Sequence, residues 1–136
     1  MYRDTITLFC RRGALWYPTV LEGVNLNLSR SAIIKEYGEQ STDNAVLNVH
    51  LPAVKPYLSP KDWQAVADPQ NYITFTDGQK FDFFWMGEWD GTEPISDSDY
   101  GFGSFYDYMN KNEDYVYAVT SCAYFSVIPH LEVTGK

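Results

Sequence analysis

Polar and apolar residues alternate along three stretches of the chain, at residues 5–10, 24–28 and 45–51. In the first stretch Ile6 and Leu8 fall on one side and Thr7 falls on the other. A period of two is typical of a strand that buries one face, so each stretch predicts a half-buried β-strand. The apolar residues 15–21 predict another strand, which Pro18 would bend or place at an edge.

Three short helices are expected from capping residues and from a change in period, at residues 32–37, 60–66 and 104–112. Ser59 can cap the second of them, and Pro60 suits its first position. Ser104 and Asp107 have the spacing of a capping box, in which each side chain accepts a backbone N–H of the other residue.

Strand signals return in the second half of the chain. Residues 72–76 and 80–86 flank Asp77-Gly78, a dipeptide that favours a tight β-hairpin. Residues 115–127 are rich in β-branched and aromatic side chains and predict a long strand, and residues 131–134 predict a short final one.

These elements predict a mainly β fold. The count is about seven strands, with two or three short helices and one long inserted loop at residues 87–103. No strand is followed by a long helix, which argues against a parallel α/β sheet. We therefore expect one domain over residues 1–136, built as a small antiparallel β-barrel or sandwich.

Charge narrows the range of functions. The formal net charge is −8. Many of the acidic residues lie between residues 88 and 114, where Lys111 is the only basic residue. Proteins that bind nucleic acid need a basic surface to neutralise phosphates, and anionic membranes attract basic surfaces as well. We therefore expect no specific nucleic-acid partner and no membrane partner. The acidic segment predicts a solvated loop or a surface that meets a basic partner.

Side chains that could carry out chemistry are few and scattered. Cys10 and Cys122 form no closely spaced pair and no signal peptide is evident, so we expect free, buried thiols in a reducing cytoplasm. With His50 and His130 they could supply four zinc ligands, but at spacings that no zinc motif uses. We predict no catalytic residue, no metal site and no cofactor. A loosely held divalent ion and a glycosidase-like use of Glu88 remain alternatives.

Aromatic residues gather late in the chain. They could fill the core, hold the long loop, stack against sugars, or anchor a protein partner, since Trp and Tyr dominate interface hot spots. We expect residues 87–112 to be a mobile arm that orders on contact with a neighbour, so that truncating its rings would leave the core intact. The candidate interface residues are Trp85, Trp89, Tyr100, Phe102, Tyr106 and Tyr108.

The order of these features carries a resemblance to a known family. A strand begins almost at once after Tyr2, a short helical crossover precedes residues 45–51, and the chain closes on a long strand into residues 127–133. In this layout the chain resembles small structural proteins of the head–tail joining region of tailed phages and prophages. It is similar to minor capsid proteins of phages of Gram-positive bacteria and to head-completion or head-closure (stopper) proteins, which are small β-barrels that form a ring.

The resemblance implies a non-enzymatic virion protein that connects head to tail. It implies two kinds of partner, other copies of the chain in a ring homo-oligomer and neighbouring connector or tail proteins. The expected location is the bacterial cytoplasm during assembly and then the virion. The alternatives are a tail terminator or capsid accessory protein, a carbohydrate- or receptor-binding module, and an acid-catalysed hydrolase. The resemblance assigns no functional residue.

Overall fold

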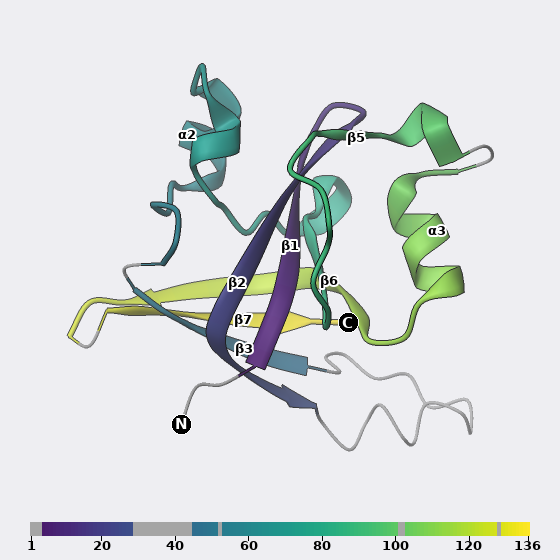
Figure 1. Cartoon of the computed structure of the whole chain (residues 1–136). Coiled ribbons are helices and arrows are strands. Elements are labelled where there is room, and N and C mark those ends of the chain that lie inside the picture. Colours follow the sequence, from purple (N-terminus) through teal and green to yellow (C-terminus); the bar gives the residue numbers. More distant parts are fainter. Residues whose placement is uncertain (1–3, 29–44, 52, 101–102, 128) are drawn as a thin grey trace.

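The computed structural model describes residues 4–28, 45–51, 53–100, 103–127 and 129–136. Six antiparallel strands close into a barrel in the order β1–β4–β6–β7–β3–β2, and β2 pairs back to β1 (Figure 1). The fold is therefore a barrel, one of the two architectures expected from the sequence. The barrel strands are β1 (Asp4–Arg12), β2 (Leu15–Leu28), β3 (Ala45–His50), β4 (Phe83–Trp85), β6 (Val116–Phe125) and β7 (His130–Gly135).

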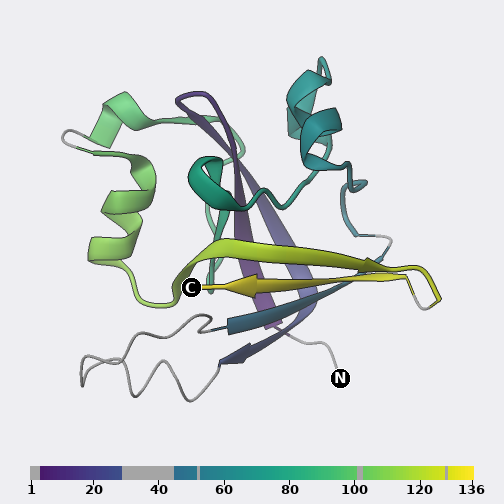
Figure 2. The same ribbon diagram turned by 180° about the vertical axis from the view of Figure 1, so that it is seen from behind.

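Short helical elements lie outside the barrel wall. Two of them, α2 (Pro60–Ala65) and α3 (Phe105–Asn112), lie on opposite sides of the β1–β2 hairpin (Figures 1 and 2). The expected caps are confirmed, because Ser59 accepts the N–H of Asp62 and Ser104 forms the full capping box. The helix expected at residues 32–37 lies outside the described residues. Three 3₁₀ turns complete the set: η2 (Pro69–Asn71), η3 (Gly78–Lys80) and η4 (Asp97–Tyr100).

None of the helices in the described part of the chain is long and apolar enough to cross a membrane.

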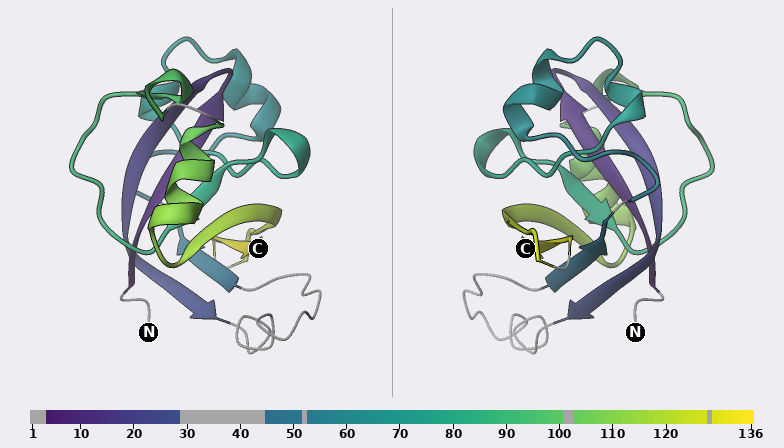
Figure 3. Two further views of the ribbon diagram at one scale, coloured as in Figure 1. Left: turned by 90° about the vertical axis from the view of Figure 1, so that its right-hand side faces the viewer. Right: turned by 90° about the vertical axis from the view of Figure 1, so that its left-hand side faces the viewer.

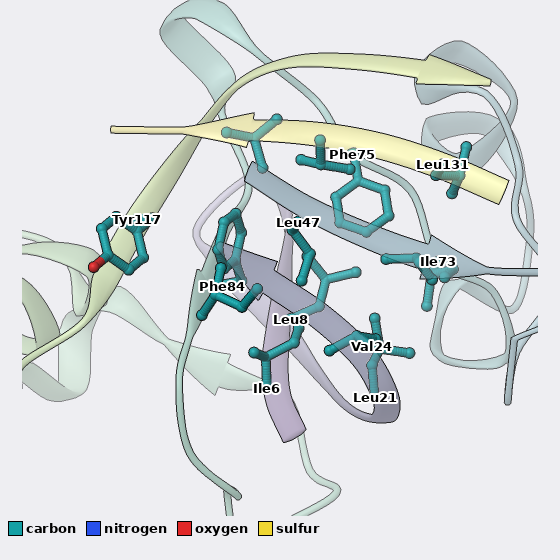
Figure 4. Packing of buried hydrophobic residues seen from close by; sticks show 14 of the residues in the cluster. Ile6, Leu8, Leu21, Val24, Leu47, Ile73, Phe75, Phe84, Tyr117 and Leu131 are labelled. Atoms are coloured by element: carbon teal, nitrogen blue, oxygen red, sulfur yellow. The ribbon is translucent and has the colours of Figure 1, made fainter. Parts of the chain in front are cut away.

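The barrel interior is filled by the inward faces of the strands. Ile6, Leu8 and Cys10 of β1 point inward, as their alternation predicted, and each is at most 1% exposed. They pack against Leu47 of β3 and Phe84 of β4 in one continuous cluster (Figure 4). A large apolar core of this kind supplies most of the free energy that favours folding.

The outer face of β1 is also buried, which the alternation did not predict. Thr7 and Phe9 point away from the barrel interior, and both are 0% exposed. Phe9 packs on Phe105 of α3, and Thr7 bonds to the backbone of Gly87 and Trp89 in the chain that leads to α3. That chain includes the short strand β5 (Ile95–Ser96), which pairs with β2, and Figure 3 shows α3 beside the barrel. This forms a second core, called here the outer cluster, of Phe9, Trp16, Phe83, Ile95, Phe105, Met109 and Val116.

The expectation of a mobile arm over residues 87–112 is therefore wrong for its described part. That part contains β5, η4 and α3, and its side chains pack on the barrel. The long loop expected at residues 87–103 is likewise interrupted by β5 and η4. The sequence pattern missed this because the apolar residues of the segment lie among acids and glycines and follow no strand period.

Strand β2 runs without a break over a stretch that was expected to form two strands. Gly23 has φ +67°, a conformation that favours glycine, and the β1–β2 register shifts at the neighbouring pairs. The shift is typical of a β-bulge, which bends a strand without ending it. One long strand can then pair with β1 along its first part and with β3 along its last part.

The hairpin expected at Asp77-Gly78 is absent from the described chain. Residues 72–76 form no strand, and Ile73 makes a single parallel bridge to Tyr57. Gly78 instead begins the 3₁₀ turn η3, and β4 pairs with β1 and β6. The dipeptide does turn the chain, but the strands that it should join are not neighbours.

A buried carboxylate explains this departure. Asp82 is 0% exposed, and its two carboxylate oxygens each accept a backbone N–H, from Arg11 and from Thr76, both at 2.7 Å. Its own backbone N–H donates to the Thr76 carbonyl at 2.8 Å, and its carbonyl accepts the N–H of Val119 at 2.9 Å. One residue thus joins β1, β6 and the segment before β4.

Burial makes ionisation of this carboxyl group costly. It raises the pKa of Asp82 to about 7 from a usual value of 3.8, although the hydrogen bonds from Arg11 and Thr76 act in the opposite direction. Between these two pH values the folded state keeps a proton that the unfolded state has released. The contribution of Asp82 to stability is therefore complete below about pH 4 and is lost as the pH rises through about 7.

Replacing Asp82 by asparagine should lower the free energy of unfolding by about 1–3 kcal/mol, because an amide oxygen can satisfy only one of the two N–H donors. The deficit relative to wild type should be larger at pH 5 than at pH 8, since only the wild type gains stability as the pH falls. Urea unfolding of both proteins at pH 5 and pH 8 measures this deficit. Asp77→Asn, on an exposed turn, controls for the change in net charge. An equal deficit at the two pH values would contradict the raised pKa.

Candidate functional site: the groove beside α3

The aromatic residues singled out in the sequence surround the outer cluster and do not form one surface patch. Trp85 lies on β4 and Trp89 follows it, Tyr100 ends η4, and Tyr106 lies on α3; all four are half-buried. Tyr108, also on α3, is 44% exposed. Phe102 lies outside the described residues.

Two of these rings support the outer cluster directly. Trp89 meets Phe9 and Phe105 edge-on, with ring centroids 5.5 and 5.4 Å apart. Tyr106 meets Phe81 and Phe83 edge-on, at 4.7 and 5.1 Å. Such pairs add to the stability that burial alone provides. These contacts argue against the expectation that the two rings could be removed without harm to the fold.

One acid fixes this layer to the barrel, and its role could not be predicted from the sequence. Asp97 accepts the indole N–H of Trp16 at 2.6 Å and the backbone N–H of Phe105 at 2.8 Å through the same carboxylate oxygen. Its own backbone N–H donates to the Ala14 carbonyl at 2.9 Å. The start of α3 is thereby held against the β1–β2 hairpin, which fixes the position of the helix beside β6.

A groove of about 880 Å³ lies between α3 and the neighbouring part of β6. It is open to solvent, and aromatic rings, carboxylates and one lysine, Lys136, line it. We call it the α3 groove. The lining residues used in the argument below are Phe81, Tyr106, Glu113, Asp114, Tyr115 and Tyr117.

Tyr115 has an unusual backbone conformation at the mouth of this groove. Its φ is +61°, and it is the one non-glycine residue of the described chain with a positive φ. Its carbonyl accepts the N–H of Met86 at 3.1 Å, while its side chain is 52% exposed. The left-handed region costs an L-residue about 1–2 kcal/mol, and residues held there concentrate at functional sites. No sequence pattern could have identified this residue.

The α3 groove combines neutral phenols with exposed carboxylates. Burial, followed by a nearby acid, raises the pKa of Tyr106, and burial, followed by Tyr115, raises the pKa of Tyr117. Both phenols therefore stay protonated at neutral pH. Glu113 and Asp114 are exposed beside them. Aromatic faces and carboxylates together favour a cationic group, above all a guanidinium.

A second, smaller groove holds the two other tryptophan candidates. It has a volume of about 410 Å³ and is lined by Trp85, Glu88, Trp89, Asp90 and Gly91. The sequence thus placed aromatic and acidic residues correctly near one another, but the structure divides them between two grooves.

The cysteine thiols are poorly suited to nucleophilic chemistry. Cys10 donates to the Thr74 carbonyl at 3.4 Å, and burial, followed by the Asp82 carboxylate, raises its pKa well above the usual value. Burial also raises the pKa of Cys122 to about 11. The thiolate is the reactive form, so both side chains are nearly inert at neutral pH. Both cysteines are free, as expected.

The two histidines come together in a way that the sequence could not show. His50 of β3 lies opposite His130 of β7 in the strand register, and the Phe125 ring stacks on the His130 ring at 4.8 Å. Across the described ranges, no group of three or more His, Cys, Asp or Glu side chains could hold a metal ion.

Comparison with known proteins places the chain in a family. A family model described as "Family of unknown function (DUF6751)" matches residues 1–136. The chain belongs to this family. No curated protein and no solved structure matches it.

Truncating both Trp89 and Tyr106 to alanine should lower the free energy of unfolding by at least about 3 kcal/mol. Trp89 packs on two rings of the outer cluster, and Tyr106 packs on Phe83 of that cluster and on Phe81 beside it. Denaturant unfolding monitored by circular dichroism measures the change. Tyr108→Ala is the matched control, and it should cost less than about 1 kcal/mol because Tyr108 is 44% exposed and lies outside the outer cluster. A double variant as stable as wild type would show that the rings are not part of the core.

Proposed function

We propose that this chain is a non-enzymatic binding protein of a larger assembly, and that its α3 groove holds a cationic segment of a partner protein. The observation that carries the proposal is Tyr115, which lines the groove with an exposed side chain, directly follows two acids in the chain, and has a strained backbone. An exposed side chain that costs stability suggests a role other than folding.

The chemistry of the α3 groove supports a lysine- or arginine-bearing partner. A guanidinium group can stack on the rings of Tyr106 or Tyr115 and form charge-assisted hydrogen bonds with Glu113 or Asp114. The net charge of −8 would attract such a partner from a distance. The groove has a volume of about 880 Å³ and is open to solvent, so it has room for several side chains of a partner segment.

In its specific form, the proposal is that the assembly is a phage particle and that the chain joins head to tail. Support for this form comes from the order of elements in the sequence, and a small closed barrel is compatible with it. A ring of copies and neighbouring connector or tail proteins are the partners that we propose. Tail terminator and capsid accessory protein are the alternatives of the same class.

Tyr115→Gly should raise the free energy of unfolding by about 1 kcal/mol, because glycine adopts a positive φ without strain. The same change should weaken binding of a fluorescent hexa-arginine peptide to the α3 groove. Thermal unfolding and fluorescence anisotropy at low salt measure the two effects. If the variant is more stable but binds the peptide as tightly as wild type, Tyr115 is not part of the binding site.

Neutralising two groove acids, in the double variant Glu113→Gln and Asp114→Asn, should weaken peptide binding about tenfold or more. The matched control is Glu22→Gln with Glu93→Gln, which changes the net charge equally at exposed acids outside the groove. Binding should also fall steeply with salt. Equal losses of peptide affinity in the two double variants would show that the attraction is non-specific. Binding of sugars that does not depend on salt would favour the carbohydrate-binding alternative at Trp85 and Trp89.

For the specific form, the tagged chain should co-purify with phage particles from a strain that carries its natural phage or prophage. Gold-labelled antibody should mark the joint between head and tail, and deletion of the gene should leave filled heads and unattached tails. Negative-stain electron microscopy shows both. Normal infectious particles after deletion would refute the joining role.

A further inference from the structure

Strand β6 is longer than the barrel that it helps to close. Its residues 116–118 pair with β4, whereas residues 121–125 pair with β7 and with no other strand of the described chain. β4 begins only at Phe83, because the backbone of Asp82 is bonded to Thr76. The β6–β7 ribbon therefore projects beyond the barrel, and in Figure 1 it extends to the left of the other strands.

The free edge of residues 121–125 and the tip beyond it are unusually apolar for a projecting ribbon. Tyr124 is 57% exposed, Phe125 is 44% exposed, and Val127 is 95% exposed. Ala123, which directly precedes Tyr124, is exposed as well. Exposed edges that combine β-forming residues with apolar side chains tend to accept another strand.

The same segment is also free of charge. Residues 115–129 contain no Asp, Glu, Lys or Arg, which makes them the longest uncharged run in a chain of net charge −8. Natural sheet proteins block a free edge with lysine or proline, and residues 121–125 contain neither. The protein thus has an edge open to pairing where such blocking residues would be expected.

We propose that this edge pairs with the same edge of a second copy of the chain, antiparallel about a two-fold axis at Ala123. Two acidic copies repel each other over most of their surfaces, and the uncharged edge lets their backbones approach. In an antiparallel pair, the hydrogen-bonding groups of a strand edge match those of a second copy of the same edge. When residues 121–125 of the two copies overlap fully, Ala123 lies at the centre of the contact. Ser121 then lies opposite Phe125 of the second copy.

This contact does not depend on the proposed function. The α3 groove is lined by earlier residues of β6, so either surface can be lost without the other. A two-fold contact closes with two copies and does not extend around a ring, so it differs from any contact that builds a ring. The buried area of one short edge is small, and a weak dimer in the micromolar range is expected.

The first test is the mass of the purified chain in solution. Sedimentation equilibrium should show the mass of two copies at high concentration and of one copy on dilution. Ala123→Lys should raise the dissociation constant at least several-fold, because it brings like charges together at the axis. Gln70→Lys, an exposed control with the same charge change, should leave the dimer intact. A wild-type chain that stays monomeric, or equal losses in both variants, overturns the proposal.

The second test fixes the register. In a Cys122→Ser background, Ala123→Cys should give a disulfide-linked dimer with oxidised glutathione, because residues opposite in an antiparallel pair lie about 4.5–5.5 Å apart at Cα. Ser121→Cys is the matched control, since its two copies would lie about 13 Å apart, beyond disulfide reach. Crosslinking of both variants at one rate, or of neither, would refute pairing at Ala123.

Discussion

Asp82 lies where three parts of the chain must meet before the barrel can close, and its carboxylate receives backbone N–H groups from Arg11 and Thr76. Its own backbone groups bond to Thr76 and Val119. With these bonds made, the chain enters the barrel only at Phe83, so β4 is short and β6 extends past it. A buried carboxylate must be paired with hydrogen-bond donors, and this requirement accounts for both the short β4 and the projecting ribbon.

Much of the fold could be predicted from the sequence because a period of two reports one buried face. This pattern located β1 and β3, the content of β-branched and aromatic residues located β6, and the capping residues located α2 and α3. The prediction failed where burial has another source. Phe9 looked like an outward residue because nothing in its own strand reveals the layer that covers it. The turn at Asp77-Gly78 was recognised, but local sequence does not encode that β4 pairs with β1 and β6.

The candidate site was predictable in composition and not in geometry. The sequence indicated an acidic segment rich in aromatic residues, and the α3 groove contains both kinds of side chain. Which rings face solvent depends on contacts between distant residues, as in the packing of Trp89 on Phe9. The positive φ of Tyr115 is set by the tertiary structure around it, and tyrosine carries no signal for that conformation.

The two cores share the strands between them, and this limits how the family can change over evolution. β1 sends Leu8 into the barrel and Phe9 into the outer cluster, so the layer that carries α3 is not a detachable insertion. A relative that lost this layer would expose Phe9, Phe83 and Trp16 unless all three became polar in the same lineage. The gain or loss of this layer therefore requires coordinated substitutions in the barrel.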